Sequence, residues 1–173
     1  MKKLALILAI GLLATPVFAQ SIGEKTGINS ALGVSPSTAD FVKMAAISDM
    51  FEIESSKLAA ERADDASKKF AAQMIADHSK TTAELKAMAP KAKVELPVAM
   101  DSAHQGKVDK LKDLKGADFD KEYDSMQVDA HEDAVSMFER YAKGGDNAEL
   151  KTWAGQTLPH LKHHLEMAKA LRK

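Results

Sequence analysis

The chain has 173 residues, of which 45% are hydrophobic and 28% are charged, a size and composition typical of one globular domain. Its 24 basic and 25 acidic residues leave a formal net charge of -1, which excludes the strongly basic surface that nucleic-acid binding requires. The chain contains no cysteine, so it has no disulfide and no acceptor for an N-terminal lipid.

The N-terminal residues predict a secretory signal peptide. Lys2 and Lys3 precede an apolar run over residues 4–13, and Val17 and Ala19 have the spacing of a cleavage site after Ala19. A membrane anchor is the alternative, but the apolar run is shorter than the ~20 residues needed to cross a bilayer. We therefore expect residues 1–19 to be removed, the protein to be exported to the periplasm, and the remaining chain to have no transmembrane segment.

Residues 20–36 are rich in Ser, Gly, Thr and Asn and show no sustained periodicity, which predicts a flexible leader. The bundle domain is predicted over residues 37–173. Ser37 and Asp40 form a capping box that marks the start of its first helix. From there to about Arg62, apolar and small residues recur at three- and four-residue spacing, as in an amphipathic helix.

A second helix follows after a very short joint. The pair Asp64-Asp65 ends the first helix and places negative charge at the start of the second, where the helix dipole favours it. Phe70, Met74 and Leu85 lie on one stripe of this helix, and the proline at position 90 ends it. So short a joint predicts that the two helices form an antiparallel hairpin.

Residues 91–117 predict a long crossover with a short helix over about residues 100–114. A connection of this length can run along the bundle and bring the third long helix back parallel to the second. The third helix is expected to begin near Asp118 and to end at Gly144-Gly145, a strong helix stop.

The fourth helix is expected to begin at a capping box formed by Asp146 and Glu149. Pro159 lies inside it and removes one backbone donor, which predicts a kink. No alternating strand pattern competes with these helices. The sequence therefore predicts an all-α fold: a ferritin-like four-helix bundle with a long crossover containing a short helix between helices 2 and 3.

Several strings carry a family resemblance: Phe51-Glu52-Ile53-Glu54, Met74-Ile75-Ala76-Asp77-His78, Phe119-Asp120-x-x-Tyr123, His131, and Leu158-Pro159-x-Leu161-x-x-His164-Leu165. Together they resemble a bacterial family of ferritin-like domains of unknown function, whose members are often labelled predicted outer membrane proteins. The resemblance covers about residues 37–171. It implies a helical bundle and an exported location, and it implies no established reaction.

Four ionisable residues lie near the middle of the four predicted long helices, one on each: Glu52, His78, His131 and His164. In a bundle of helices of similar length, the midpoints lie at the same depth, so these side chains are expected to converge. Three imidazoles and a carboxylate suit iron, zinc, manganese or copper. The sequence therefore makes these four residues the candidate ligands of a transition-metal ion.

Glu54, Asp77 and His160 are candidates for supporting the ligands from outside. A carboxylate-bridged di-iron centre is not favoured, because Ile75 and Leu161 stand where its Glu-x-x-His motifs would need glutamate. A site for one metal ion or a histidine-rich site fits the pattern better. No closely repeated methionine motif singles out copper.

A structural role for the histidines is the alternative. Neutral imidazoles paired with Glu52, Asp77, Tyr123 or Gln127 would form a hydrogen-bonded network that fixes the register of the helices. The protein would then be a non-enzymatic envelope or stress-related bundle with an unidentified partner. No nucleophile and base pair or phosphate-binding loop stands in a suitable context, so the sequence favours a protein that is not an enzyme.

Overall fold

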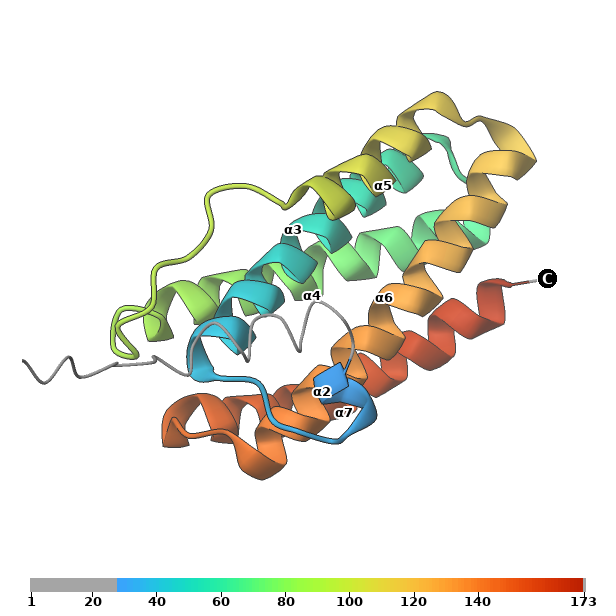
Figure 1. Ribbon diagram of the computed structural model, residues 1–173. Helices are drawn as coiled ribbons and strands as arrows, with labels where there is room; N and C mark the ends of the chain where they lie inside the picture. Colours follow the sequence, from blue (N-terminus) through green and yellow to red (C-terminus); the bar gives the residue numbers. More distant parts are fainter. Residues whose placement is uncertain (1–27, 173) are drawn as a thin grey trace, which may run out of the picture.

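A computed structural model describes residues 28–172 as a bundle of helices (Figure 1). The predicted signal peptide at residues 1–19 lies outside the described residues. The helices are α2 (Ile28–Ala31), α3 (Thr38–Arg62), α4 (Asp65–Met88), α5 (Ser102–Asp113), α6 (Gly116–Gly144) and α7 (Ala148–Leu171). The described part of the chain contains no strand, which confirms the prediction of an all-α fold. None of its helices combines the length and apolarity that a membrane span requires.

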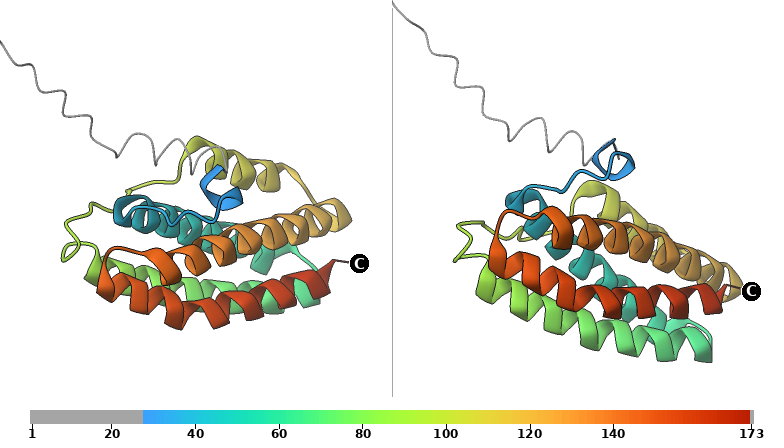
Figure 2. Two further views of the ribbon diagram at one scale, coloured as in Figure 1. Left: turned by 60° about the horizontal axis from the view of Figure 1, so that its bottom comes forward. Right: turned by 90° about the horizontal axis from the view of Figure 1, so that it is seen from below.

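The four long helices form two hairpins joined by a crossover. Helices α3 and α4 pack along each other, as do α6 and α7, and the loop and short helix α5 connect the two hairpins (Figures 1 and 2). Across the hairpins, α3 contacts α6 and α4 contacts α7. Helix α6 consequently runs parallel to α4, and the predicted crossover with its short helix is confirmed.

Side-chain caps fix where the long helices begin. Ser37 Oγ accepts a hydrogen bond from the Asp40 amide at 3.1 Å and donates to the Asp40 carboxylate at 2.9 Å, which is the predicted capping box. Helix α7 begins one residue later than predicted. Its cap is Asn147, whose Oδ1 accepts from the amide of Leu150, whereas the Asp146 carboxylate is bonded by the hydroxyl of Thr38.

Part of the predicted leader has regular structure. Residues 28–36 include α2, whose Ser30 hydroxyl lies 2.9 Å from that of Ser136 on α6. Arg140 on α6 donates a hydrogen bond of 2.6 Å to the backbone carbonyl of Val34. These bonds between distant residues cannot be read from local composition, and they explain why this stretch differs from the expected structureless leader.

The buried side chains form two apolar clusters, one toward each end of the bundle. Phe41, Tyr141 and Trp153 belong to the first, where the Phe41 and Tyr141 rings stack with centroids 3.9 Å apart. Phe70 and Phe119 belong to the second. Between them lies a layer of buried polar residues, namely Asp49, Glu52, Ser55, His78, Gln127, His131 and His164. Each polar atom in this layer needs a partner, because burial removes it from water.

The turn after α6 yields a test of the packing. A Cβ at Gly145 would lie 2.6 Å from the Tyr141 carbonyl oxygen and 2.7 Å from the Tyr141 ring. We expect Gly145→Ala to lower the free energy of unfolding by about 1–3 kcal/mol through overpacking, as measured by urea denaturation. Gly106→Ala is the control: position 106 is exposed in the middle of α5 with open space around it, and the change should raise stability by about 0.5–1 kcal/mol. If the two substitutions change the free energy of unfolding equally, Gly145 is not packed closely against Tyr141.

Candidate metal site

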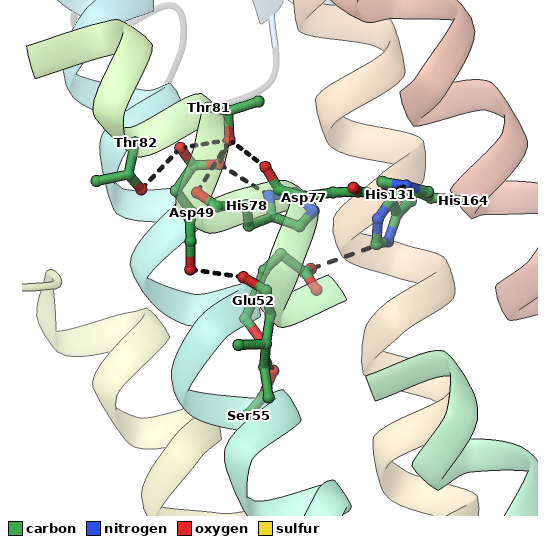
Figure 3. Close-up of polar contacts among 11 residues, drawn as sticks. Asp49, Glu52, Ser55, Asp77, His78, Thr81, Thr82, His131 and His164 are labelled. Atoms are coloured by element: carbon green, nitrogen blue, oxygen red, sulfur yellow. Dashed lines mark hydrogen bonds and ion pairs between the residues drawn. The ribbon is translucent and has the colours of Figure 1, made fainter. Parts of the chain in front are cut away.

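Three histidines converge in the polar layer from three different helices. His78 on α4, His131 on α6 and His164 on α7 are 3%, 1% and 4% exposed (Figure 3). Their ring centroids lie 5.5–5.8 Å apart, and one nitrogen from each ring lies within 4.8 Å of the other two. Helices of similar length with mid-helix histidines produce this meeting, as the sequence predicted.

A hydrogen-bond acceptor orients each ring from outside. His78 Nδ1 lies 2.8 Å from a carboxylate oxygen of Asp49, and His164 Nε2 lies 2.8 Å from one of Asp77. His131 Nδ1 lies 2.8 Å from the backbone carbonyl oxygen of Gln127, one turn earlier on α6. Ionised carboxylates and carbonyl oxygens only accept hydrogen bonds, so these ring nitrogens carry the proton and donate it.

The proton on the outer nitrogen leaves a lone pair on the other nitrogen of each neutral ring. These inner nitrogens are His78 Nε2, His131 Nε2 and His164 Nδ1. All three are buried, and none has a hydrogen-bond partner within residues 28–172. They are the nitrogens left over when the outer contacts are made, so three ring nitrogens without a hydrogen-bond partner lie close together in the interior.

Burial keeps two of the rings neutral. It lowers the pKa of His131 to about 3, an effect to which the nearby His78 adds. Burial also lowers the pKa of His164, although the hydrogen bond to Asp77 opposes it. Burial disfavours the charged form of His78 as well, but its hydrogen bond to Asp49 and the nearby Glu52 carboxyl outweigh this and raise the pKa of His78.

Glu52 lies at the edge of the histidine cluster. One of its carboxyl oxygens is 3.9 Å from His131 Nδ1, the nitrogen that donates to Gln127 (Figure 3). Both oxygens are buried without a hydrogen-bond partner in the described part of the chain, and burial raises the pKa of Glu52 to about 7. The structure thus places Glu52 beside His131 but outside the group of three histidine nitrogens, and a role for it as a ligand remains a prediction.

A groove of about 240 Å³ runs between α4 and α7 and reaches the cluster from the surface. His78 and His164 form part of its wall, so two of the three histidines border it. Its other lining residues include Asp77, Thr81, Glu84, Trp153 and His160. His131 does not line this groove and lies on the inner side of the cluster.

The sequence matches the profile of the family described as "Domain of unknown function (DUF4142)" over residues 23–171. The chain belongs to the DUF4142 family. No curated protein is significantly similar to it in sequence. Among solved structures, CopM in the Cu(II)-bound form is similar, with a TM-score of 0.67 and 18% identity. That alignment covers 80% of this chain and 97% of CopM. At this identity the likeness shows a shared helical-bundle fold.

Three residues of this DUF4142 chain were expected to support the ligands. The structure places each of them differently relative to the histidines. Asp77 holds His164, as described above. His160 lies on the groove one turn before His164. Glu54 is exposed and pairs with Lys57 at 2.7 Å, so it does not reach the histidines. Helical phase explains the difference between the two glutamates, because Glu54 lies two residues and therefore about 200° around α3 from buried Glu52.

The sequence did not predict Asp49, the buried carboxylate that orients His78 in this DUF4142 protein. Besides His78, its carboxylate accepts hydrogen bonds from the Thr81 hydroxyl at 2.9 Å and the Thr82 hydroxyl at 3.1 Å (Figure 3). A signal was present: Asp49 lies seven residues after Val42 and seven before Ser56, on a stripe of α3 that faces inward. A carboxylate on a buried stripe needs donors, and a helix packed against it must supply them.

Proposed function

We propose that this DUF4142 protein binds one transition-metal ion through His78 Nε2, His131 Nε2 and His164 Nδ1. The observation that carries the proposal is the meeting of three buried ring nitrogens, none of which has a hydrogen-bond partner in the described residues. A buried polar atom without a partner costs about 1–3 kcal/mol, so three at one place strongly destabilise a metal-free bundle. A metal ion would accept all three lone pairs at once.

The outer hydrogen bonds support the same proposal. Histidines that bind metals commonly donate their second ring nitrogen to a carboxylate or a backbone carbonyl, which fixes the tautomer and the ring orientation. Asp49, Asp77 and the Gln127 carbonyl act in this way on the three rings. A structural network would have no need to leave the inner nitrogen of every ring without a partner.

Copper(II) is the metal to test first, followed by zinc, iron and manganese. Imidazole ligands suit copper, zinc and iron, and among divalent ions of this row copper binds most tightly to a given nitrogen site. CopM, which shares the fold, was solved with Cu(II) bound. We further propose that Glu52, whose buried oxygens have no hydrogen-bond partner in residues 28–172, would turn from His131 Nδ1 toward the inner nitrogens and become the fourth ligand.

We also propose that the protein acts outside the cytoplasm. The lysines, apolar run and cleavage site at residues 1–19 support export to the periplasm. A ferritin-like bundle that holds one metal ion through histidines fits binding or transfer of the metal. No reaction is proposed, since the site gives no sign of a substrate.

The test is metal analysis of protein purified without a histidine tag. We expect about one Cu²⁺ per chain and a higher melting temperature with added Cu²⁺, because free metal at 100 times its Kd stabilises the fold by about 2.7 kcal/mol. His78→Ala and His164→Ala should remove both effects. His163→Ala should keep them, because His163 is exposed on the same helix as His164. If no metal co-purifies and none of the four metals shifts the melting temperature, the proposal is wrong.

A structural role is the second candidate, and one observation favours it. The hydrogen bond between Asp49 and His78 joins α3 to α4, and the one between Asp77 and His164 joins α4 to α7. Both would hold helices in register without any metal. The two candidates predict opposite effects when His131 is made apolar.

A further inference from the structure

The groove between α4 and α7 offers a path from solvent to the three histidines. Apolar clusters flank the histidines toward both ends of the bundle, and His131 and Glu52 are each only 1% exposed. A metal ion crossing those apolar clusters would lose its water without replacement ligands, at high cost in free energy. The groove instead presents polar side chains along its length, ending at His78 and His164.

His160 lies on this groove with its imidazole unused. It is exposed, and within residues 28–172 it makes no hydrogen bond or ion pair. It stands four residues before His164 on α7, so the two rings project from the same side of the helix, one turn apart. Imidazole is the commonest side-chain ligand for transition metals.

Two carboxylates accompany His160 on the groove. Glu84 is partly exposed; one of its oxygens accepts a hydrogen bond of 2.7 Å from Trp153 Nε1, and the other lies 4.0 Å from Nζ of Lys80, which also lines the groove. Asp77 is 36% exposed and accepts hydrogen bonds from His164 and from Gln73 through the same oxygen, Oδ2. The two carboxylates outnumber the one lysine that lines the groove, and a groove of net negative charge raises the local concentration of cations and the rate at which they arrive.

From this arrangement we propose that hydrated divalent transition-metal ions reach the buried site through the α4–α7 groove. His160, with the carboxylates of Glu84 and Asp77, forms an outer capture site. The ion exchanges water there for the His160 ring, then moves one turn inward to His164 and His78. This inference rests on the proposed metal site and adds to it a route and the residues that set the rate of loading.

The test measures the association rate of CuCl₂ by stopped-flow fluorescence on the full chain. Trp153 is the only tryptophan in the sequence and lines the groove, so quenching by Cu²⁺ reports arrival directly. We expect His160→Ala to slow association about tenfold at low ionic strength. The affinity at equilibrium, measured by competition with a chelator, should change far less, because His160 is not one of the three inner ligands.

Glu84→Gln tests whether the charge of Glu84, rather than the shape of its side chain, sets the association rate of Cu²⁺. The glutamine oxygen can still accept the hydrogen bond from Trp153, while the negative charge is lost. We expect association to slow several-fold at low salt and the difference from the wild type to shrink at about 1 M salt, where charges are screened beyond about 3 Å. His163→Ala is the matched control, since His163 is exposed on the same helix but does not line the groove.

The outcomes distinguish this inference from the metal site itself. If His160→Ala and Glu84→Gln bind Cu²⁺ as fast as the wild type and His163→Ala, the route through the groove is wrong while the site stands. If the wild type binds no Cu²⁺, both proposals fail. Gln156→Phe, which places a bulky ring on the groove without removing a ligand or a charge, should also slow association; an unchanged rate would argue against this route.

Discussion

Replacing His131 with leucine is expected to abolish metal binding and yet leave the metal-free protein at least as stable as the wild type. The ring is buried and neutral, with its pKa lowered to about 3, and its Nε2 has no hydrogen-bond partner in the described chain. Leucine has a similar volume, removes this unsatisfied acceptor, and packs next to the Phe70 ring, whose centroid is 6.2 Å from that of His131. The Gln127 backbone carbonyl loses the hydrogen bond from the His131 ring but still accepts its backbone hydrogen bond within α6.

The expected gain is about 1 kcal/mol, since relief of an unsatisfied buried group is worth about 1–3 kcal/mol and the lost hydrogen bond about 1 kcal/mol. Urea denaturation with a chelator present measures it, and the shift in melting temperature with added Cu²⁺ should vanish. His163→Leu, the same change at an exposed histidine, should affect neither quantity. If His131→Leu instead lowers the free energy of unfolding by about 2 kcal/mol or more, the result would favour the structural role, because breaking a buried hydrogen-bonded network costs about that much.

Asp49→Ala is expected to lower stability and metal affinity together. It would leave His78 Nδ1 and the hydroxyls of Thr81 and Thr82 without their carboxylate. Breaking a buried pair of this kind costs about 3–5 kcal/mol. We expect the lower end of that range, because the Thr81 hydroxyl can also bond the His78 backbone carbonyl, 3.1 Å away.

Asp49→Asn distinguishes orientation from charge. The amide oxygen can still accept the hydrogen bond from His78, so most of the stability should remain, whereas the Cu²⁺ affinity should fall by about 10–100-fold as the ligand becomes less basic. Asp77→Asn is the comparison at a partly exposed position and should cost less than about 1 kcal/mol. Competition titrations and urea denaturation measure the two quantities. Unchanged Cu²⁺ affinity in Asp49→Asn would show that Asp49 does not tune a metal ligand.

Helical periodicity was enough to predict the architecture. Helices of 24–29 residues carry strong three- and four-residue patterns, and their near-equal lengths placed His78, His131 and His164 at one depth. The structure shows that all three rings are almost completely buried.

Contacts between distant residues were beyond the sequence. Asp49 resembles any surface aspartate until Thr81, Thr82 and His78 of the neighbouring helix are placed around it. The cap of α7 shifted from Asp146 to Asn147 because Thr38, more than 100 residues away, binds the Asp146 carboxylate. Such choices depend on packing between elements, which a local pattern does not contain.

The histidines are divided unequally between the two hairpins. The α3–α4 hairpin supplies His78 with its partner Asp49, and the α6–α7 hairpin supplies His131 and His164. Neither hairpin contains all three rings, so a metal ion bound to them would link the two hairpins across the surface where they pack. Opening of one hairpin away from the other would dismantle the coordination sphere, and release of the metal would therefore be coupled to the docking of two halves that the chain joins by only one long crossover.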